Sequence, residues 1–281
     1  MSNESAWRII EPEGRLFDLK LGELWHYRDL VYLFVRRDFL AHYKQTILGP
    51  AWNFVQPLLT TIMFTLVFGK IASLPTDGAP AFLFYMAGIV MWGYFSSVLV
   101  NTSETFTTNA HIFGKVYFPR LVMPVSTLAS KLLAFAVQFC VFLCCLAYFW
   151  LHGANVAPNR WVMATPLLLL SMAALASGLG IIVSSLTTRY RDLAVVVGFG
   201  VQLLMYATPV IYPLSAIPEP YRTWVALNPI APVMEVFRYA YLGAGTFSIG
   251  MLIYSFLITA VILLAGIVMF NKVERTFMDT V

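Results

Sequence analysis

Three uncharged polar side chains recur along one apolar stretch near the start of the chain. Asn53, Gln56 and Thr60 are spaced i, i+3 and i+7, so they share one face of a helix. Amides and hydroxyls form hydrogen bonds, here either with a neighbouring helix or with the contents of a water-filled pathway. Gln202 and Tyr206 form a second polar pair, one helical turn apart. These five residues are candidates for the lining of a polar channel, and helix packing remains the alternative.

The residue types that enzymes use for bond-breaking chemistry are missing or scattered. A P-loop requires G-x-x-x-x-G-K-[ST], whereas the two Gly-Lys pairs of this chain are followed by Ile and Val. Neither a carboxylate pair for glycosyl chemistry nor a histidine beside Cys140, Cys144 and Cys145 is present, so we expect no metal and no catalysis. Lys131 is the only ionisable residue well inside an apolar stretch, and we expect its amine to snorkel toward water. An ion-driven carrier is therefore disfavoured.

The composition is that of a membrane protein. Of the 281 residues, 59% are hydrophobic and 11% are charged, against about 45–50% and 25% in soluble domains. A soluble core of this length could not bury so much apolar surface, which excludes soluble enzymes and nucleic-acid readers. Each long stretch without a charge can hold the ~20 residues that cross a bilayer. We expect an all-α membrane protein with six transmembrane helices, at 51–69, 80–101, 126–150, 162–186, 193–213 and 249–270.

The basic residues indicate the orientation of these spans. With both termini on one side, that side holds 13 of the 18 Lys and Arg residues, and the opposite side holds Lys70, Arg160, Arg222 and Arg238. The positive-inside rule then places both termini in the cytoplasm. Residues 1–20 contain no early apolar run, so we expect no signal peptide, and the first span would direct insertion.

Residues 1–50 are expected to form a cytoplasmic region with an interfacial helix, and residues 51–281 the six-span transmembrane domain. Within 15–45, apolar residues at helical spacing alternate with charges, a pattern typical of a helix that lies in the membrane interface. The simplest role of its cations is attachment to acidic lipid headgroups. These cations include Arg28, Arg36, Arg37 and Lys44.

Two cytoplasmic loops carry features of a partner surface. The loop 102–120 mixes aromatic and aliphatic residues with basic ones, and we expect a short amphipathic helix there that ends before Pro119. Exposed aromatic residues beside basic ones indicate a contact site for another protein. The shorter loop 187–192 would contribute a second contact. The candidate contact residues are Ile112, Phe113, Lys115, Tyr117, Arg189 and Arg191.

The segment before the last span predicts two short helices on the opposite side of the membrane. Prolines interrupt it, and 220–227 and 232–242 fit helices, with Gly243 as a stop. Both are apolar enough to re-enter the outer leaflet as a lid; a hairpin lying flat on the membrane is the alternative. Tyr221, Trp224, Glu235 and Arg238 are the candidate residues of such a periplasmic gate.

Several short motifs resemble the ABC-2-type permease family. Tyr43-Lys44-Gln45-Thr46, Leu48-Gly49, Trp52 and Pro57 match the family's entry into its first span. Four further motifs follow in the family's order: Lys115–Arg120 with Pro124, Tyr190-Arg191-Asp192, Thr208–Tyr212 and Leu227-Asn228-Pro229. The similarity covers nearly the whole chain and is greatest to polysaccharide exporters of the O-antigen type.

The resemblance implies a function that composition does not. Two copies of the chain would pair with two separate ATPase subunits, which bind ATP and Mg. The dimer would move an undecaprenyl-diphosphate-linked glycan across the bacterial inner membrane, and the cations of the interfacial helix would attract its diphosphate. Export of teichoic acid, capsule, a drug or a small lipid by the same fold remains open. An ion-coupled carrier and a glycolipid-modifying enzyme are the remaining, weaker alternatives.

Overall fold

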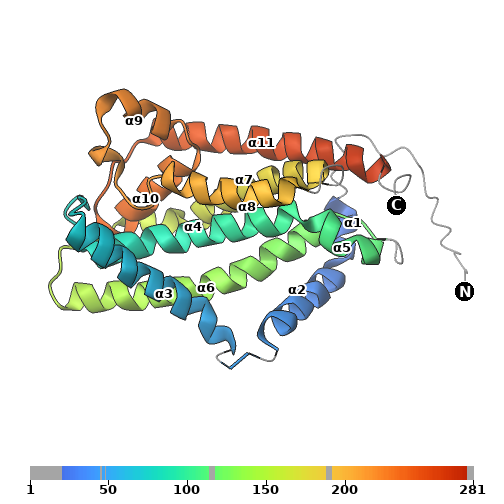
Figure 1. The fold of residues 1–281 in the computed structure, drawn as a ribbon, viewed down its shortest axis with the longest axis horizontal. Coiled ribbons are helices and arrows are strands. Elements are labelled where there is room, and N and C mark those ends of the chain that lie inside the picture. Colours follow the sequence, from blue (N-terminus) through green and yellow to red (C-terminus); the bar gives the residue numbers. More distant parts are fainter. Residues whose placement is uncertain (1–20, 45, 48, 114–117, 188–191, 277–281) are drawn as a thin grey trace, which may run out of the picture.

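The computed structural model describes residues 21–44, 46–47, 49–113, 118–187 and 192–276, and it contains no strand within these ranges. It is a bundle of helices along one axis (Figure 1). The helices are α1 (Leu21–His26), α2 (Arg28–Tyr43), α3 (Trp52–Phe64), α4 (Ala81–Ser103), α5 (Thr105–Phe113), α6 (Val122–Leu151), α7 (Thr165–Thr187), α8 (Leu193–Tyr206), α9 (Glu219–Ala226), α10 (Ile230–Leu242) and α11 (Ile249–Thr276). A π-helical stretch, Thr65–Ile71, continues α3, and short 3-10 turns span Gly49–Ala51, Arg160–Ala164 and Leu214–Ala216.

Helices α4 and α7 form the centre of the bundle, and α11 packs on the other side of α7. Small residues permit this close packing. A Cβ on Gly180 would lie 2.7 Å from the Cβ of Thr102, and one on Gly266 would lie 2.7 Å from the carbonyl oxygen of Gly178. Gly180 is therefore a point of close approach between α7 and α4, as is typical of small residues in membrane helix packing.

Five helices are long and apolar enough to cross a membrane: Gly49–Ile71, Ala81–Ser103, Val122–Leu151, Arg160–Thr187 and Ile249–Lys272. The sixth predicted span is shorter than expected. Helix α8 has 14 residues, a length of about 21 Å, whereas a bilayer core is about 30 Å thick. The all-helical membrane fold is therefore confirmed, and the expected span at 193–213 contains a helix only over its first part.

From the end of α3 onward, the connecting segments gather at two opposite ends of the bundle (Figure 1). At one end, Phe34 of α2, Phe106 of α5 and Phe270 of α11 belong to one buried cluster. At the other end, the Asn159 side chain donates to the carbonyl of Tyr239 at 2.8 Å, and Ser215 donates to Asp77 at 2.6 Å. The loops after α3 therefore alternate between the two ends.

The region expected to hold one interfacial helix contains two. Helix α1 ends at His26 and α2 begins at Arg28, with Tyr27 between them. The buried Phe34 anchors α2 to the end of the bundle, and α2 then diverges from α6 as it approaches α3 (Figure 1).

The short helices expected in the loop 102–120 and before the last span are present as α5, α9 and α10. Gly243 ends α10 with a φ of 72°, a left-handed conformation that glycine adopts without a steric penalty. Almost every side chain of α10 is buried, because α10 packs against α4, α7, α11 and the 3-10 turn before α7.

Candidate functional site

A buried ion pair lies within α10. Glu235 and Arg238 are one helical turn apart, and Nη1 of Arg238 lies 3.6 Å from Oε1 of Glu235. Their side chains are 2% and 1% exposed. Removing two charges from water costs more than their mutual attraction returns unless further hydrogen bonds satisfy them. The surrounding contacts supply those bonds.

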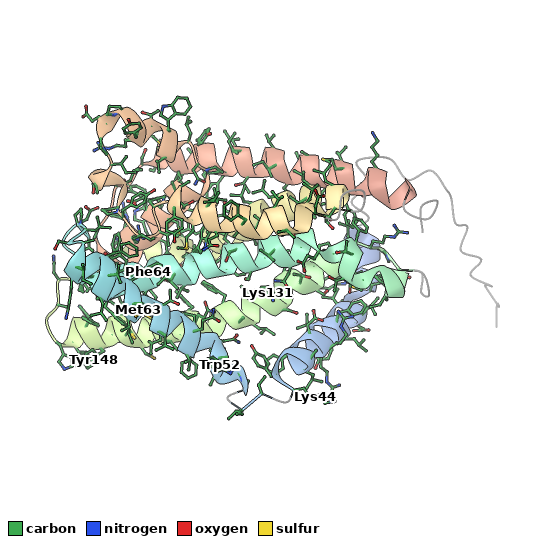
Figure 2. The ribbon with its side chains drawn as sticks, in the orientation of Figure 1. Lys44, Trp52, Met63, Phe64, Lys131 and Tyr148 are labelled. Atoms are coloured by element: carbon green, nitrogen blue, oxygen red, sulfur yellow. The ribbon has the colours of Figure 1, made fainter. Side chains whose placement is uncertain are left out.

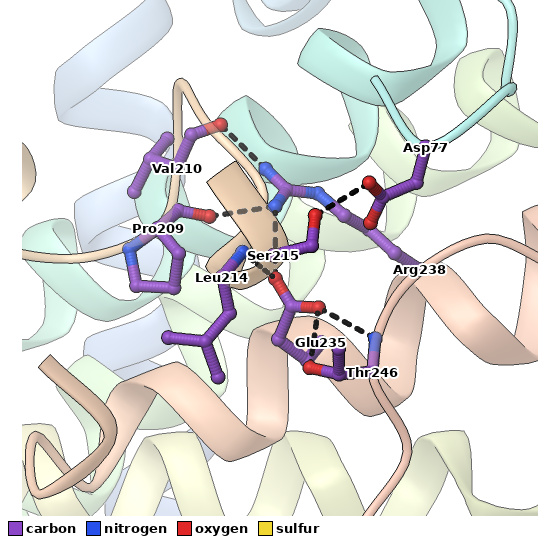
Figure 3. Close-up of polar contacts among 8 residues, drawn as sticks. All are labelled: Asp77, Pro209, Val210, Leu214, Ser215, Glu235, Arg238 and Thr246. Carbon is purple, nitrogen blue, oxygen red and sulfur yellow. Dashed lines mark hydrogen bonds and ion pairs between the residues drawn. The ribbon is translucent and has the colours of Figure 1, made fainter. Parts of the chain in front are cut away.

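Arg238 holds the chain that follows α8. Its Nη1 donates to the carbonyl oxygen of Pro209 at 2.7 Å, and its Nη2 donates to that of Val210 at 2.5 Å (Figure 3). The guanidinium also lies over the ring of Phe84 on α4. Gly88 makes room for this arrangement, because a Cβ there would lie 2.6 Å from the Val210 oxygen and 2.8 Å from Nη2 of Arg238.

Glu235 holds two further segments. It accepts the backbone N–H of Leu214 at 3.2 Å through Oε1, and the backbone N–H and hydroxyl of Thr246 at 3.0 and 3.3 Å through Oε2 (Figure 3). The pair thus fixes the stretches 209–214 and 243–246 to α10. Both guanidinium Nη atoms and both carboxylate oxygens are bonded, whereas the buried Nε of Arg238 has no partner among the described residues, so the pair positions the backbone at this end.

The four predicted gate residues all lie at this end of the bundle, in two different environments. Glu235 and Arg238 form the buried pair, whereas Tyr221 and Trp224 on α9 are 66% and 75% exposed. Arg222, also on α9, donates to the carbonyls of Ser215 and Ile217, both at 3.2 Å. Helix α9 therefore presents two large aromatic rings outward from a loop that the ion pair holds.

The predicted channel residues lie on the two least covered long helices, α3 and α8. Gln56 is exposed, and the hydroxyl of Thr60 donates to the Gln56 carbonyl at 2.9 Å. Asn53 is partly buried, and its amide donates to the hydroxyl of Tyr43 at the end of α2. Gln202 and Tyr206 are exposed on α8. Within the described part of the chain, no hydrogen bond joins the three polar residues of α3 to the two of α8.

Large apolar side chains surround these polar groups. Trp52 and Met63 of α3 are exposed (Figure 2), as are Phe199 and Leu203 of α8. A membrane or a second copy of the chain would cover such faces.

The predicted headgroup cations lie along α2 and just beyond it. Arg28 and Arg36 are exposed on α2, and Lys44 is exposed directly after it. Arg37 is already engaged: its Nη2 lies 2.8 Å from Asp38, and its guanidinium lies 4.8 Å from the centre of the Phe34 ring.

The predicted partner-contact residues are only partly described. Ile112 of α5 is partly buried against the cluster of Phe34, Phe106 and Phe270, so it is less accessible than a loop residue would be. Phe113 is the last residue of α5. Lys115, Tyr117, Arg189 and Arg191 lie outside the described residues.

Sequence reasoning selected Glu235 and Arg238 but missed the residues that complete their site, among them Phe84, Gly88 and Thr246. Two opposite charges at i, i+3 within an apolar segment are a local signal for such a pair. The partners are distant in sequence and apolar or small, so no local pattern marks them.

The model of the ABC-2 type transporter family matches residues 29–242. The chain belongs to this family. The match begins in α2, ends at the last residue of α10 and contains the Glu235–Arg238 pair. An O-antigen export system permease protein RfbA of Klebsiella pneumoniae is 27% identical over 256 residues, covering 89% of this chain and 94% of that protein.

Two further relatives have similar names. An RfbA permease of Myxococcus xanthus is 29% identical over 77% of this chain and 81% of its own length. The polysialic acid transport protein KpsM of Escherichia coli is 23% identical over 87% of this chain and 93% of its own length. The similarity to these permeases spans most of both sequences.

Proposed function

We propose that this chain is the transmembrane subunit of an ABC exporter that moves a lipid-linked polysaccharide of the O-antigen type across the bacterial inner membrane. The observation that carries the proposal is the match to the ABC-2 family over 29–242, together with relatives named as O-antigen export permeases. Capsular polysaccharide is the second candidate substrate, and similarity to the capsule polysaccharide export inner-membrane protein CtrC of Neisseria meningitidis supports it.

In this proposal the chain crosses the membrane six times and keeps both termini in the cytoplasm. Helix α8 with the following segment 207–213 would form the fifth crossing, since α8 packs alongside α4 and α7 (Figure 1). The end with α9 and α10 would face the periplasm, and α10 would re-enter the membrane within the protein. The 13-to-4 distribution of basic residues supports this orientation.

The functional unit would be a dimer of this chain with two ATPase subunits. The exposed faces of α3 and α8 support a dimer, because they combine large apolar side chains with Gln56, Gln202 and Tyr206. Two such faces would enclose a channel whose amides and hydroxyls hydrogen-bond to sugar hydroxyls only weakly, so that the polymer can move on. The ATPases would dock at the end with α5, and ATP and Mg would bind there rather than on this chain.

The decisive experiment is purification of the chain together with the proteins encoded beside it. The proposal requires that a P-loop ATPase co-purifies and that a polyprenyl-diphosphate-linked saccharide stimulates its ATP hydrolysis in lipid nanodiscs. Stimulation by O-antigen-type but not by capsular acceptors would separate the two substrates. Transport activity that survives without any ATPase would contradict the proposal.

A further inference from the structure

A cavity of about 620 Å³ lies between α2, the start of α3, the junction of α4 with α5, and α6. This volume falls within the range of about 300–1,000 Å³ typical of small-molecule sites. Figure 2 shows Lys131 on α6, with Trp52 at the start of α3 and Lys44 just after α2. Arg37 and Asn53, predicted above as a headgroup cation and a channel residue, also line this cavity.

The wall formed by α6 changes from polar to apolar along its length. Ser126, Ser130 and Lys131 line the cavity nearer the start of α6, at the end of the bundle that holds α2 and α5. Leu133 and Val137 line it further along, toward the middle of the helix, and are 50% and 37% exposed. This gradient fits an amphiphile whose headgroup lies near the bundle end and whose chain points toward the bilayer centre.

Two polar groups on this wall have unused hydrogen-bonding capacity. Lys131 makes no hydrogen bond or close ion pair within the described part of the chain. The Oγ of Ser130 is buried and has no partner among the described residues. An ammonium group and a hydroxyl that line the same cavity are suited to the oxygens of a phosphate, since a hydrogen bond between ionised groups is about twice as strong as a neutral one.

The facing wall offers acceptors. Asp38 of α2 and Glu104, just after α4, line the cavity, and so does Asn109 of α5. The Asn109 amide nitrogen is bound to the carbonyl of Thr105 at 3.0 Å, which leaves its oxygen free to accept. Arg37, Lys131, Asp38 and Glu104 make the lining neutral overall, so it suits a headgroup that combines a phosphate with donors such as an ammonium or sugar hydroxyls.

We propose that this cavity binds the headgroup of a phosphate-bearing lipid. Its phosphate oxygens lie at Lys131 and Ser130, its donor groups face Asp38 and Glu104, and its hydrocarbon chain follows Leu133 and Val137. The lipid is either a membrane phospholipid or the lipid-linked glycan, and only the second case rests on the function proposed above.

The test is native mass spectrometry of the full chain with its co-purified ATPase in detergent. Three lipids are titrated: phosphatidylethanolamine, a polyprenyl-diphosphate disaccharide, and diacylglycerol as a lipid without phosphate. We expect at least one phosphate lipid to bind the wild type, and K131Q to weaken that binding about tenfold or more, the usual effect of losing a hydrogen bond to a charged group. K131R should keep most of the affinity.

Two further variants separate the site from general effects. K70Q removes an exposed lysine at the opposite end of the bundle and should bind like the wild type. A134F adds bulk to the cavity lining without changing charge and should weaken binding as K131Q does. Wild-type affinity in both K131Q and A134F, or equal binding of diacylglycerol, would overturn the proposal.

Competition identifies the source of the lipid. The cavity binds the lipid-linked glycan if the polyprenyl-diphosphate disaccharide displaces phosphatidylethanolamine from the wild type and this displacement is lost in K131Q. Binding of phosphatidylethanolamine that depends on Lys131 but resists displacement assigns it to a membrane phospholipid. The second result would stand even if no saccharide stimulated the ATPase, so the two proposals can fail separately.

Discussion

The guanidinium carbon of Arg238 lies 3.8 Å from the centre of the Phe84 ring, which packs a cation of α10 against the central helix α4. The same group donates to the carbonyls of Pro209 and Val210. One side chain therefore connects three parts of the chain at the end of the bundle where α9 exposes its aromatic rings.

Replacing Arg238 should destabilise the fold. R238M leaves Glu235 charged and buried without its partner, which costs about 3–5 kcal/mol. R222M is the matched control, because Arg222 lies at the same end but is exposed, and exposed polar contacts contribute little. Denaturant unfolding in detergent, followed by tryptophan fluorescence, measures both. Equal losses in the two variants would show that the buried pair has no special role.

The bounds of the long spans could be predicted from the sequence, because charged residues lie at their ends. The expected spans 80–101, 162–186 and 249–270 correspond to α4 (Ala81–Ser103), α7 (Thr165–Thr187) and α11 (Ile249–Thr276). The span 193–213 was predicted too long as a helix, since hydropathy does not detect a helix end within an apolar run. Helix α8 ends at Tyr206, where Pro209 lacks a donor and Arg238 holds the next two carbonyls.

The candidate site could be predicted only in part, because its contacts join residues that are distant in sequence. A charge within an apolar segment is conspicuous, so Glu235 and Arg238 stand out, but Arg238 bonds to carbonyls 28 and 29 residues earlier. The α2–α6 cavity was missed, because it joins residues from α2, α3, α5 and α6 that share no local pattern.

Gly180 should tolerate no side chain. A Cβ there would lie 2.7 Å from Thr102 and 2.9 Å from the carbonyl oxygen of Leu99, so G180L forces α7 away from α4. Overpacking of this kind costs about 1–3 kcal/mol. G198L in α8 is the control, since nothing lies within 4 Å of a Cβ at Gly198. Thermal unfolding of the two variants should differ clearly, and a similar midpoint for both would contradict the close helix packing.

The proposed orientation predicts which loops are accessible from outside the cell. In a cysteine-free background, N155C should react with an impermeant thiol reagent in intact spheroplasts, and T107C should react only after lysis. Asn155 and Thr107 are both exposed and lie at opposite ends of the bundle. Labelling of T107C in intact spheroplasts, without labelling of N155C, would require the inverted topology.

The end of α5 is expected to transmit ATP hydrolysis to the bundle. F113D places a charge at the proposed docking surface and should abolish export while membrane insertion and ATPase activity persist. T107D is the control on the same helix, because Thr107 is exposed and its hydroxyl bonds only locally to the Glu104 carbonyl at 3.0 Å. Export is measured as polymer reaching the periplasm per assembled complex. Normal export by F113D in an intact complex would exclude α5 as the coupling element.

The polar face of α3 is expected to line the export pathway. Gln56 is exposed in the single chain, so Q56L removes an amide without opening a cavity in the fold. If the face lines a channel, Q56L should slow export several-fold and leave thermal stability within about 0.5 kcal/mol, as for other surface substitutions.

A packing role predicts the opposite result for Q56L. The dimer would be less stable, and transport by each surviving complex would be unchanged. Cysteines at 53, 56 and 60 provide the direct measurement, probed with a small hydrophilic thiol reagent while the partner ATPase hydrolyses ATP. We expect Q56C and T60C to react, and N53C to react more slowly, because Asn53 is partly buried against Tyr43. I62C, on the exposed part of α3 away from this face, is the control for lipid exposure. If none of the three reacts during hydrolysis, the face is buried packing and the polymer passes elsewhere.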